Sequence, residues 1–256
     1  MKARVLAWRL AIAVAIVAIW EGGVRATLFD PFFVSQPSDI AARIAAWLTS
    51  GLIWGHLLVT LEEAFLGLVI GSALGIGAGF VLGRSPLAAR VCDPYVTMLN
   101  AVPRVVLAPL FLLWFGLGIW SKVALGITLV FFIVFFNVYQ GVKEVSPTVL
   151  ANARMLGMNE RQLMRHVYWP SALSWMFSSL HTSVGFAVVG AVVGEYLGAA
   201  AGLGYLIQQA EGVFDVAGVF AGMFVLAAFV IVIDVIVTLV ERRLLVWRPA
   251  PSEAKP

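Results

Sequence analysis

The chain has 256 residues, of which 61% are hydrophobic and 12% charged, with a mean hydropathy of +0.96 and a formal net charge of +3. Soluble globular chains are roughly 45–50% apolar and about 25% charged, so a soluble enzyme, a disordered chain and a fibrous repeat are excluded. The excess apolar residues must face lipid. The small net charge gives no reason to expect a nucleic-acid partner, and the single cysteine, Cys92, can form neither an internal disulfide nor a cysteine zinc site.

Six apolar runs are long enough to cross a bilayer, because a spanning helix needs about 20 residues. They predict an all-α, polytopic membrane protein with about six transmembrane helices, forming a single transmembrane domain over residues 1–256. A cleaved signal peptide is the alternative for the first run, but no small-residue cleavage site follows it, which favours a retained span. The predicted spans are Val5–Glu21, Leu57–Leu82, Val91–Phe115, Ile119–Gln140, Ala172–Leu197 and Val219–Leu239.

Lysine and arginine are concentrated on one side of these spans. Of the 17, 13 lie in the N-terminus, the Arg84–Arg90 loop, the Lys143–Arg165 loop and the C-terminal tail. The alternate loops hold only Arg25, Arg43 and Lys122. The positive-inside rule therefore predicts that both termini are cytoplasmic.

The longest outer segment, Thr27–His56, contains a predicted helix from about Ser38 to Leu48. Ile40, Ile44, Trp47 and Leu48 share one face of that helix. Two interpretations stay open: an amphipathic helix lying on the outer membrane surface, or a lid packed on the helical bundle.

The second span carries a glycine every fourth residue. In lipid, small residues at this spacing let two helix backbones approach closely. Packing within one subunit is favoured over a contact between subunits, and either arrangement places this helix centrally. The glycine ladder comprises Gly67, Gly71, Gly75, Gly79 and Gly83.

The third span is interrupted by prolines and carries Asn100, Pro103 and Arg104 close together. A charge at membrane depth costs at least a few kcal/mol and normally faces water or protein. One interpretation is a water-lined path beside a broken helix. The other is an arginine that extends to the cytoplasmic interface.

The loop over residues 143–170 predicts two short capped helices. Ser146 and Pro147 are typical of a helix start, and Gly157 ends a helix over Val149–Leu156. Asn159 and Gln162 then have capping-box spacing, and Pro170 is predicted to stop the second helix before the fifth span.

These two helices are predicted to expose an apolar, methionine-rich face suited to docking onto another protein. The face is predicted to comprise Met155, Leu156, Met158, Leu163 and Met164, bordered by Arg154, Arg161 and Arg165.

The spacing of this loop resembles a known motif. Ala153, Gly157, Val167 and Trp169–Pro170 match the coupling-loop pattern of ATP-binding-cassette importer permeases, Glu-Ala-Ala, three residues, Gly, nine residues, Ile, one residue, Leu-Pro. Further blocks resemble the nitrate, sulfonate, taurine and bicarbonate branch, which includes permeases for pyrimidine vitamin precursors. These blocks are Leu107–Lys122, Val192–Ile207 and Glu241–Trp247, and the resemblance covers a permease core at about 57–247.

One departure from the family motif concerns its acidic residue. The motif's glutamate falls on Ala151 and its first alanine on Asn152, so docking is expected to depend on the apolar patch and the arginines. The docking residues implied by the resemblance are Ala153, Arg154, Leu156, Gly157, Met158, Arg161, Val167 and Pro170.

The resemblance implies a type I importer permease in a bacterial cytoplasmic membrane. It implies a homodimer, a pair of cytoplasmic ATPase subunits on the two loops, and an extracytoplasmic substrate-binding protein. The chain has no Gly-x-x-x-x-Gly-Lys-Ser/Thr phosphate loop, so no cofactor is expected in it, and ATP and magnesium are expected in the partner ATPase. The substrate stays open among nitrate, sulfonate or taurine, bicarbonate and a pyrimidine vitamin precursor.

Four polar residues are candidates for the transport path or its gate: Asn100, Arg104, Glu195 and Asp234. Glu195 is interpreted either as an outer-gate residue or as a carboxylate that braces the glycine-rich turn after it. Asp234 is interpreted either as a helix–helix hydrogen-bond partner or as a path residue. The rival classes are a secondary transporter, which would show paired broken helices, and an intramembrane enzyme, which would need a nucleophile with a base or clustered ligands.

Overall fold

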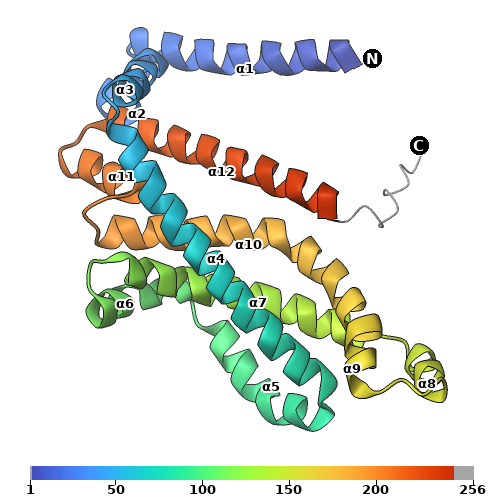
Figure 1. Cartoon of the computed structure of the whole chain (residues 1–256). Helices are drawn as coiled ribbons and strands as arrows, with labels where there is room; N and C mark the ends of the chain where they lie inside the picture. Colours follow the sequence, from blue (N-terminus) through green and yellow to red (C-terminus); the bar gives the residue numbers. More distant parts are fainter. Residues whose placement is uncertain (1, 245–256) are drawn as a thin grey trace. The chain divides into compact units, whose positions relative to one another are not determined.

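The computed structural model describes residues 2–244, so the end of the block Glu241–Trp247 and the basic tail beyond it lie outside the described residues. Within that range the elements are helices (Figure 1). Five of them are long and apolar enough to cross a membrane. They are α1 (Lys2–Arg25), α4 (Leu52–Arg84), α7 (Ile119–Lys143), α10 (Trp169–Leu197) and α12 (Val216–Leu244).

The predicted third span is a bent pair. Helix α5 (Pro86–Ala101) and the segment formed by a 3₁₀ turn, η1 (Arg104–Leu107), and α6 (Ala108–Phe115) meet at an angle of 81°. Pro103 lies in the break, where its missing N–H cannot continue the hydrogen bonds of α5. The other spans were predicted within a few residues of their observed ends.

The described residues form two compact units, one over 2–59 and 195–228 and the other over 60–194 and 229–244. The first contains α1, α2 (Pro31–Val34), α3 (Pro37–Thr49), α11 (Leu203–Gly212) and the start of α12. On α3, Ile40 and Trp47 are buried whereas Leu48 is 44% exposed, so the predicted apolar face is only partly covered.

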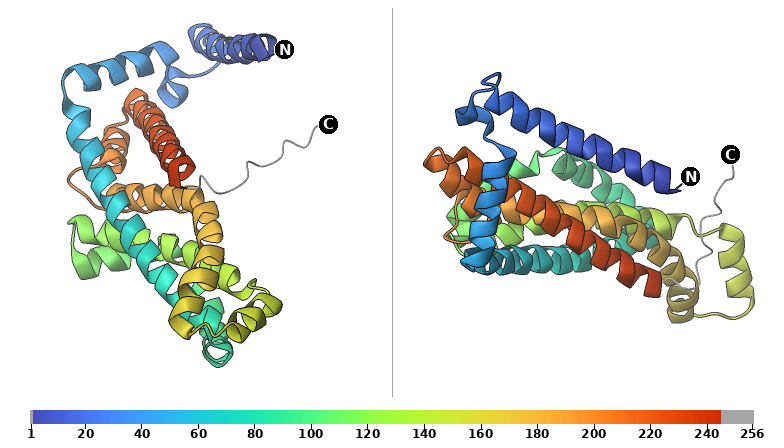
Figure 2. Two further views of the ribbon diagram at one scale, coloured as in Figure 1. Left: turned by 45° about the vertical axis from the view of Figure 1, so that its right-hand side comes forward. Right: turned by 90° about the horizontal axis from the view of Figure 1, so that it is seen from above.

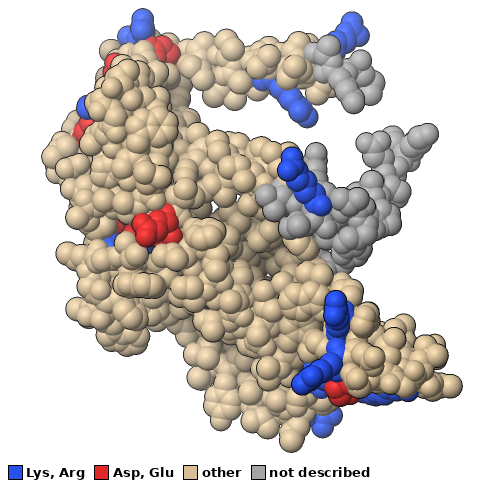
Figure 3. Space-filling view, in the orientation of Figure 1, with Lys and Arg blue, Asp and Glu red and all other residues tan. Residues whose placement is uncertain are grey.

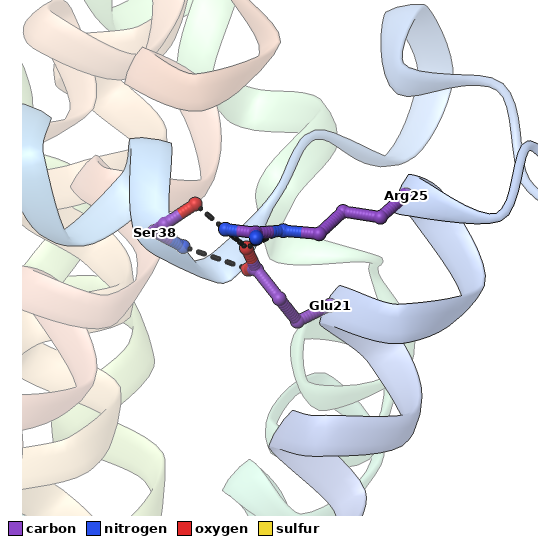
Figure 4. A network of polar contacts seen from close by, with 3 residues as sticks. All are labelled: Glu21, Arg25 and Ser38. Carbon is purple, nitrogen blue, oxygen red and sulfur yellow. Dashed lines mark hydrogen bonds and ion pairs between the residues drawn. The ribbon is translucent and has the colours of Figure 1, made fainter.

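A carboxylate ties the end of α1 to the start of α3 (Figure 4). Glu21 accepts hydrogen bonds from the Ser38 backbone N–H at 3.1 Å and from its hydroxyl at 2.9 Å, and it pairs with Arg25. Gln36, the N-cap residue of α3, makes no side-chain cap bond. Glu21 therefore satisfies a first-turn donor of α3 that its own cap residue leaves open.

In the second unit, α4, α7 and α10 pack backbone against backbone, and α7 and α10 run side by side (Figures 1 and 2). The glycine ladder of α4 faces α7 of the same chain: a Cβ at Gly75 would lie 2.8 Å from the carbonyl oxygen of Phe131. The three helices meet at Gly126 of α7. A Cβ added at Gly67 of α4 would lie 3.3 Å from the Gly126 Cα, and one added at Gly190 of α10 would lie 2.6 Å from it.

Candidate functional site

The loop between α7 and α10 begins with α8 (Pro147–Met155). The helix predicted from the sequence starts two residues later, at Val149. Gly157 ends it with φ +79°, a left-handed conformation that favours glycine. The Gly157 N–H donates to the Arg154 carbonyl at 2.9 Å, and the Met158 N–H donates to the Ala153 carbonyl at 3.1 Å. This pair of bonds is a Schellman motif, and the prediction of a glycine-terminated helix is confirmed.

The predicted capping box is also confirmed. Asn159 accepts from the Gln162 N–H at 2.9 Å, and the Gln162 side chain accepts from the Asn159 N–H at 2.8 Å. Helix α9 (Glu160–Leu163) follows and continues through a π turn, η2 (Met164–Tyr168), into α10. The prediction that Pro170 stops this helix is therefore wrong, because the wider π turn accommodates the proline ring that a regular α-helix would exclude.

The exposed tip of the loop is smaller than predicted. Met155 and Leu156 are 85% and 80% exposed, but Leu163 is only 1% exposed. Leu163 was predicted on the docking face, and this prediction is wrong: the side chain is buried in the fold, where a leucine is more stable than in water. Helix α8 extends away from α7 and α10 in each view (Figure 2), and basic side chains surround a carboxylate at its base (Figure 3).

The base of the loop is attached to the end of α4. Arg84 forms an ion pair with Glu160, and its guanidinium carbon lies 5.4 Å from the Tyr168 ring centroid. One turn earlier on α4, Phe80 stacks on Trp169 with centroids 5.4 Å apart. These contacts, which we call the α4 clamp, join the end of α4 to the loop and to the first residue of α10.

Glu160 also lies 4.0 Å from Arg154. The family motif's glutamate is absent at Ala151, and Glu160 is the carboxylate that the folded loop supplies beside Arg154. Sequence reasoning missed this residue, although an acidic residue in the first turn after an N-cap asparagine is a recognisable signal.

Asn100 and Arg104 lie together at the break of the third span. Arg104 donates to the Asn100 side chain and, at 3.2 Å, to the Asn100 carbonyl, and its guanidinium lies 4.5 Å from the Phe132 ring centroid. The arginine therefore satisfies one backbone carbonyl at the end of α5, that of Asn100, where the break removes the next helical turn.

Glu195 is 1% exposed and belongs to the first unit. The other three candidates for the path or gate belong to the second unit: Asn100, Arg104 and Asp234. Its carboxylate accepts from the Gly204 N–H at 2.7 Å. Gly202, with φ +114°, leaves room for that carboxylate, since a Cβ there would lie 2.6 Å from Oε2. The Gly202 N–H donates to His56 Nδ1 at 3.0 Å. Glu195 thus braces the turn that precedes α11.

His181 Nδ1 on α10 lies 2.8 Å from the Asp234 carboxylate on α12. The contact is a hydrogen bond when the imidazole is neutral and an ion pair when the imidazole is protonated. The aspartate side chain is 54% exposed within the described chain. A polar pair exposed along two apolar helices must face water or another protein surface in the membrane.

Sequence reasoning placed Lys122 in an outer loop, and this placement is wrong. The residue lies in the first turn of α7 and is 1% exposed. Its ammonium donates to the Leu117 carbonyl at 2.6 Å and to the Gly118 carbonyl at 3.1 Å. A buried ammonium requires such acceptors, and they come from the turn that follows α6.

Comparisons with known proteins agree with this architecture. The family described as "Binding-protein-dependent transport system inner membrane component" matches residues 67–246. A putative aliphatic sulfonates transport permease of Bacillus subtilis is 34% identical, covering 93% of this chain and 87% of that protein. A formylaminopyrimidine transport permease of Halalkalibacterium halodurans is also 34% identical, covering 91% and 92%. An inward-facing MetNI methionine transporter structure shares the fold, with a TM-score of 0.65 at 18% identity, covering 75% of this chain and 95% of that one.

Proposed function

The chain belongs to the family of binding-protein-dependent transport system inner membrane components, as the permease subunit of an ATP-driven importer, and we propose that it couples to its ATPase through the α8–α9 loop. The observation that carries this proposal is the exposed Met155–Leu156 tip, which lies between the Schellman turn that ends α8 and the capping box that begins α9. A flexible, polarizable methionine beside a leucine fits an apolar groove on a partner protein.

The connections of the loop support a mechanical coupling. Its C-terminal side continues through η2 into α10, and the α4 clamp joins it to α4. A displacement of the tip is therefore passed to two spans at once. We propose that ATP binding in the partner moves the tip and thereby switches the bundle between inward-open and outward-open states.

The proposed assembly has two copies of this chain, two ATPase subunits that hold ATP and magnesium, and an extracytoplasmic binding protein. The positive-inside distribution supports the side on which each partner binds, because the loop carries its arginines on the predicted cytoplasmic side. Lipid surrounds the apolar spans in this proposal, with α1 the most exposed of them.

For the substrate we propose an organic solute of the sulfonate or pyrimidine class. The two relatives at 34% identity are named for an aliphatic sulfonate and for a formylaminopyrimidine, and a taurine permease of Escherichia coli is 27% identical. A thermal-shift screen of the cognate binding protein against sulfonates, pyrimidines, nitrate and bicarbonate tests this assignment. Stabilisation only by nitrate or bicarbonate would contradict it.

The docking proposal is tested with Leu156→Asp in the full-length chain, co-expressed with its ATPase subunit. The charge should abolish co-purification of the ATPase while the permease stays in the membrane. Leu28→Asp is the matched control, because Leu28 is 76% exposed but lies on the predicted outer side. Equal ATPase recovery with both variants would refute docking at the tip.

A further inference from the structure

A cavity of about 460 Å³ lies in the second unit, where the end of α4, the start of α5 and the end of α7 meet. Its volume is within the roughly 300–1,000 Å³ of small-molecule sites. The predicted topology places it on the cytoplasmic side, and it takes no part in the coupling contacts described above.

The fold builds this cavity from rigid helix ends. Gly83, the last residue of the glycine ladder, brings α4 onto α7, since a Cβ there would lie 2.8 Å from the Val142 Cβ. Ser85 caps α5 by accepting from the Ala88 N–H at 3.3 Å. The first turns of α5 therefore form one wall, opposite the last turn of α7.

Two cations from different helices line the cavity: Arg90 on α5 and Lys143 on α7. Among the side chains that the structure describes, neither forms an ion pair, whereas the neighbouring Arg84 is paired with Glu160. The one acidic residue of the wall is Asp93, so two positive charges and one negative leave the wall at +1. The positive end of the α5 dipole adds to this potential.

Tyr139 orients the lysine. The Lys143 ammonium donates to the Tyr139 hydroxyl at 3.3 Å and lies 4.9 Å from the ring centroid. Because that hydroxyl oxygen accepts from the lysine, its own hydrogen is available to a third acceptor. The cavity thus presents a guanidinium, an ammonium and a hydroxyl, all donors.

Exposed apolar side chains border the polar wall. Val81 on α4 is 63% exposed, and Leu87 and Val91 on α5 are 75% and 59% exposed. They adjoin wall residues in the sequence. A ligand with an anionic headgroup and hydrocarbon chains would match both surfaces.

We infer that this cavity binds a tetrahedral oxyanion, a phosphate or sulfonate group, between Arg90 and Lys143. A guanidinium donates two parallel hydrogen bonds to such a group, and an ammonium neutralises its charge. The group has two possible sources: the headgroup of an anionic phospholipid in the inner leaflet, or a free anion of the cytoplasm. The inference does not depend on the transported solute.

The test uses the full-length chain purified in detergent. Native mass spectrometry measures phosphatidylglycerol retained against phosphatidylcholine, and thermal unfolding is followed with inorganic phosphate and with methanesulfonate. Arg90→Gln combined with Lys143→Gln should weaken binding about 10- to 30-fold. The control, Arg9→Gln with Arg165→Gln, removes the same charge elsewhere and should bind as the unaltered chain does. Asp93→Asn should tighten binding.

The two arms identify the source of the anion. Selective retention of phosphatidylglycerol without an effect of the free anions assigns the site to lipid, and stabilisation by phosphate or methanesulfonate assigns it to a soluble anion. The inference is overturned if the pocket and control pairs bind alike, if neither ligand type binds, or if Asp93→Asn weakens binding. The asparagine variant keeps the test valid even where the double glutamine variant is unstable.

Discussion

Replacing Arg84 by alanine should release the coupling loop from α4. The ion pair with Glu160 has side chains 33% and 64% exposed, so it contributes at most about 1 kcal/mol in water. The cation–π contact with Tyr168 adds roughly 0.5–1 kcal/mol. A combined loss of about 1–2 kcal/mol corresponds to a factor of roughly 5–30 in the equilibrium between attached and detached loop.

Hydrogen exchange of the purified chain measures that equilibrium directly, because exchange of α9 amides follows local opening. The Arg84→Ala chain should exchange these amides about 5- to 30-fold faster, with α7 unchanged. Arg165→Ala is the matched control, since Arg165 is exposed in the same segment and has no ion pair among the described side chains. Equal exchange in the two variants would show that Phe80 and Trp169 alone hold the loop, and the reasoning on Arg84 would be refuted.

Three further predictions concern stability and coupling. Gly75→Ala should lower the unfolding temperature, because the added Cβ would lie 2.8 Å from the Phe131 carbonyl oxygen. Gly77→Ala should not lower it, because no atom lies within 4 Å of a Cβ added there. Equal shifts in the two variants would contradict the packing of the glycine ladder on α7. Gly157→Asp should cost about 1–2 kcal/mol of local stability, because residue 157 has a positive φ. The variant should insert into the membrane but co-purify less ATPase. Unchanged co-purification would count against the Schellman turn as the feature that positions the Met155–Leu156 tip. Glu195→Ala should destabilise the chain by about 1–3 kcal/mol in thermal unfolding, because the buried Gly204 N–H in the first turn of α11 loses its acceptor. An unaltered melting temperature would exclude the bracing role.

The features that the sequence predicted well are those encoded within a few neighbouring residues. The capping box at Asn159 and the glycine turn at Gly157 depend on local backbone geometry alone. The spans were predictable because apolar runs of this length have few alternatives. The order of the long helices along the chain was predicted from the same apolar runs.

The features that the sequence did not predict depend on contacts between distant segments. The pairing of Arg84 with Glu160 joins residues 76 positions apart. Lys122 looks like an interfacial lysine in the sequence, and only the turn after α6 provides the carbonyls that allow its burial. The effect of Pro170 was misjudged because a π turn, which has no clear sequence signal, absorbs it.

The meeting of α4, α7 and α10 at Gly126 determines where the second unit can bend. Where backbones touch without intervening side chains, a change of rotamer cannot absorb a change in helix angle. The irregular points are elsewhere: the π turn over Met164–Tyr168 and the break before Arg104. We therefore expect the second unit to flex at these two positions during a transport cycle, one beside the coupling loop and one within the third span.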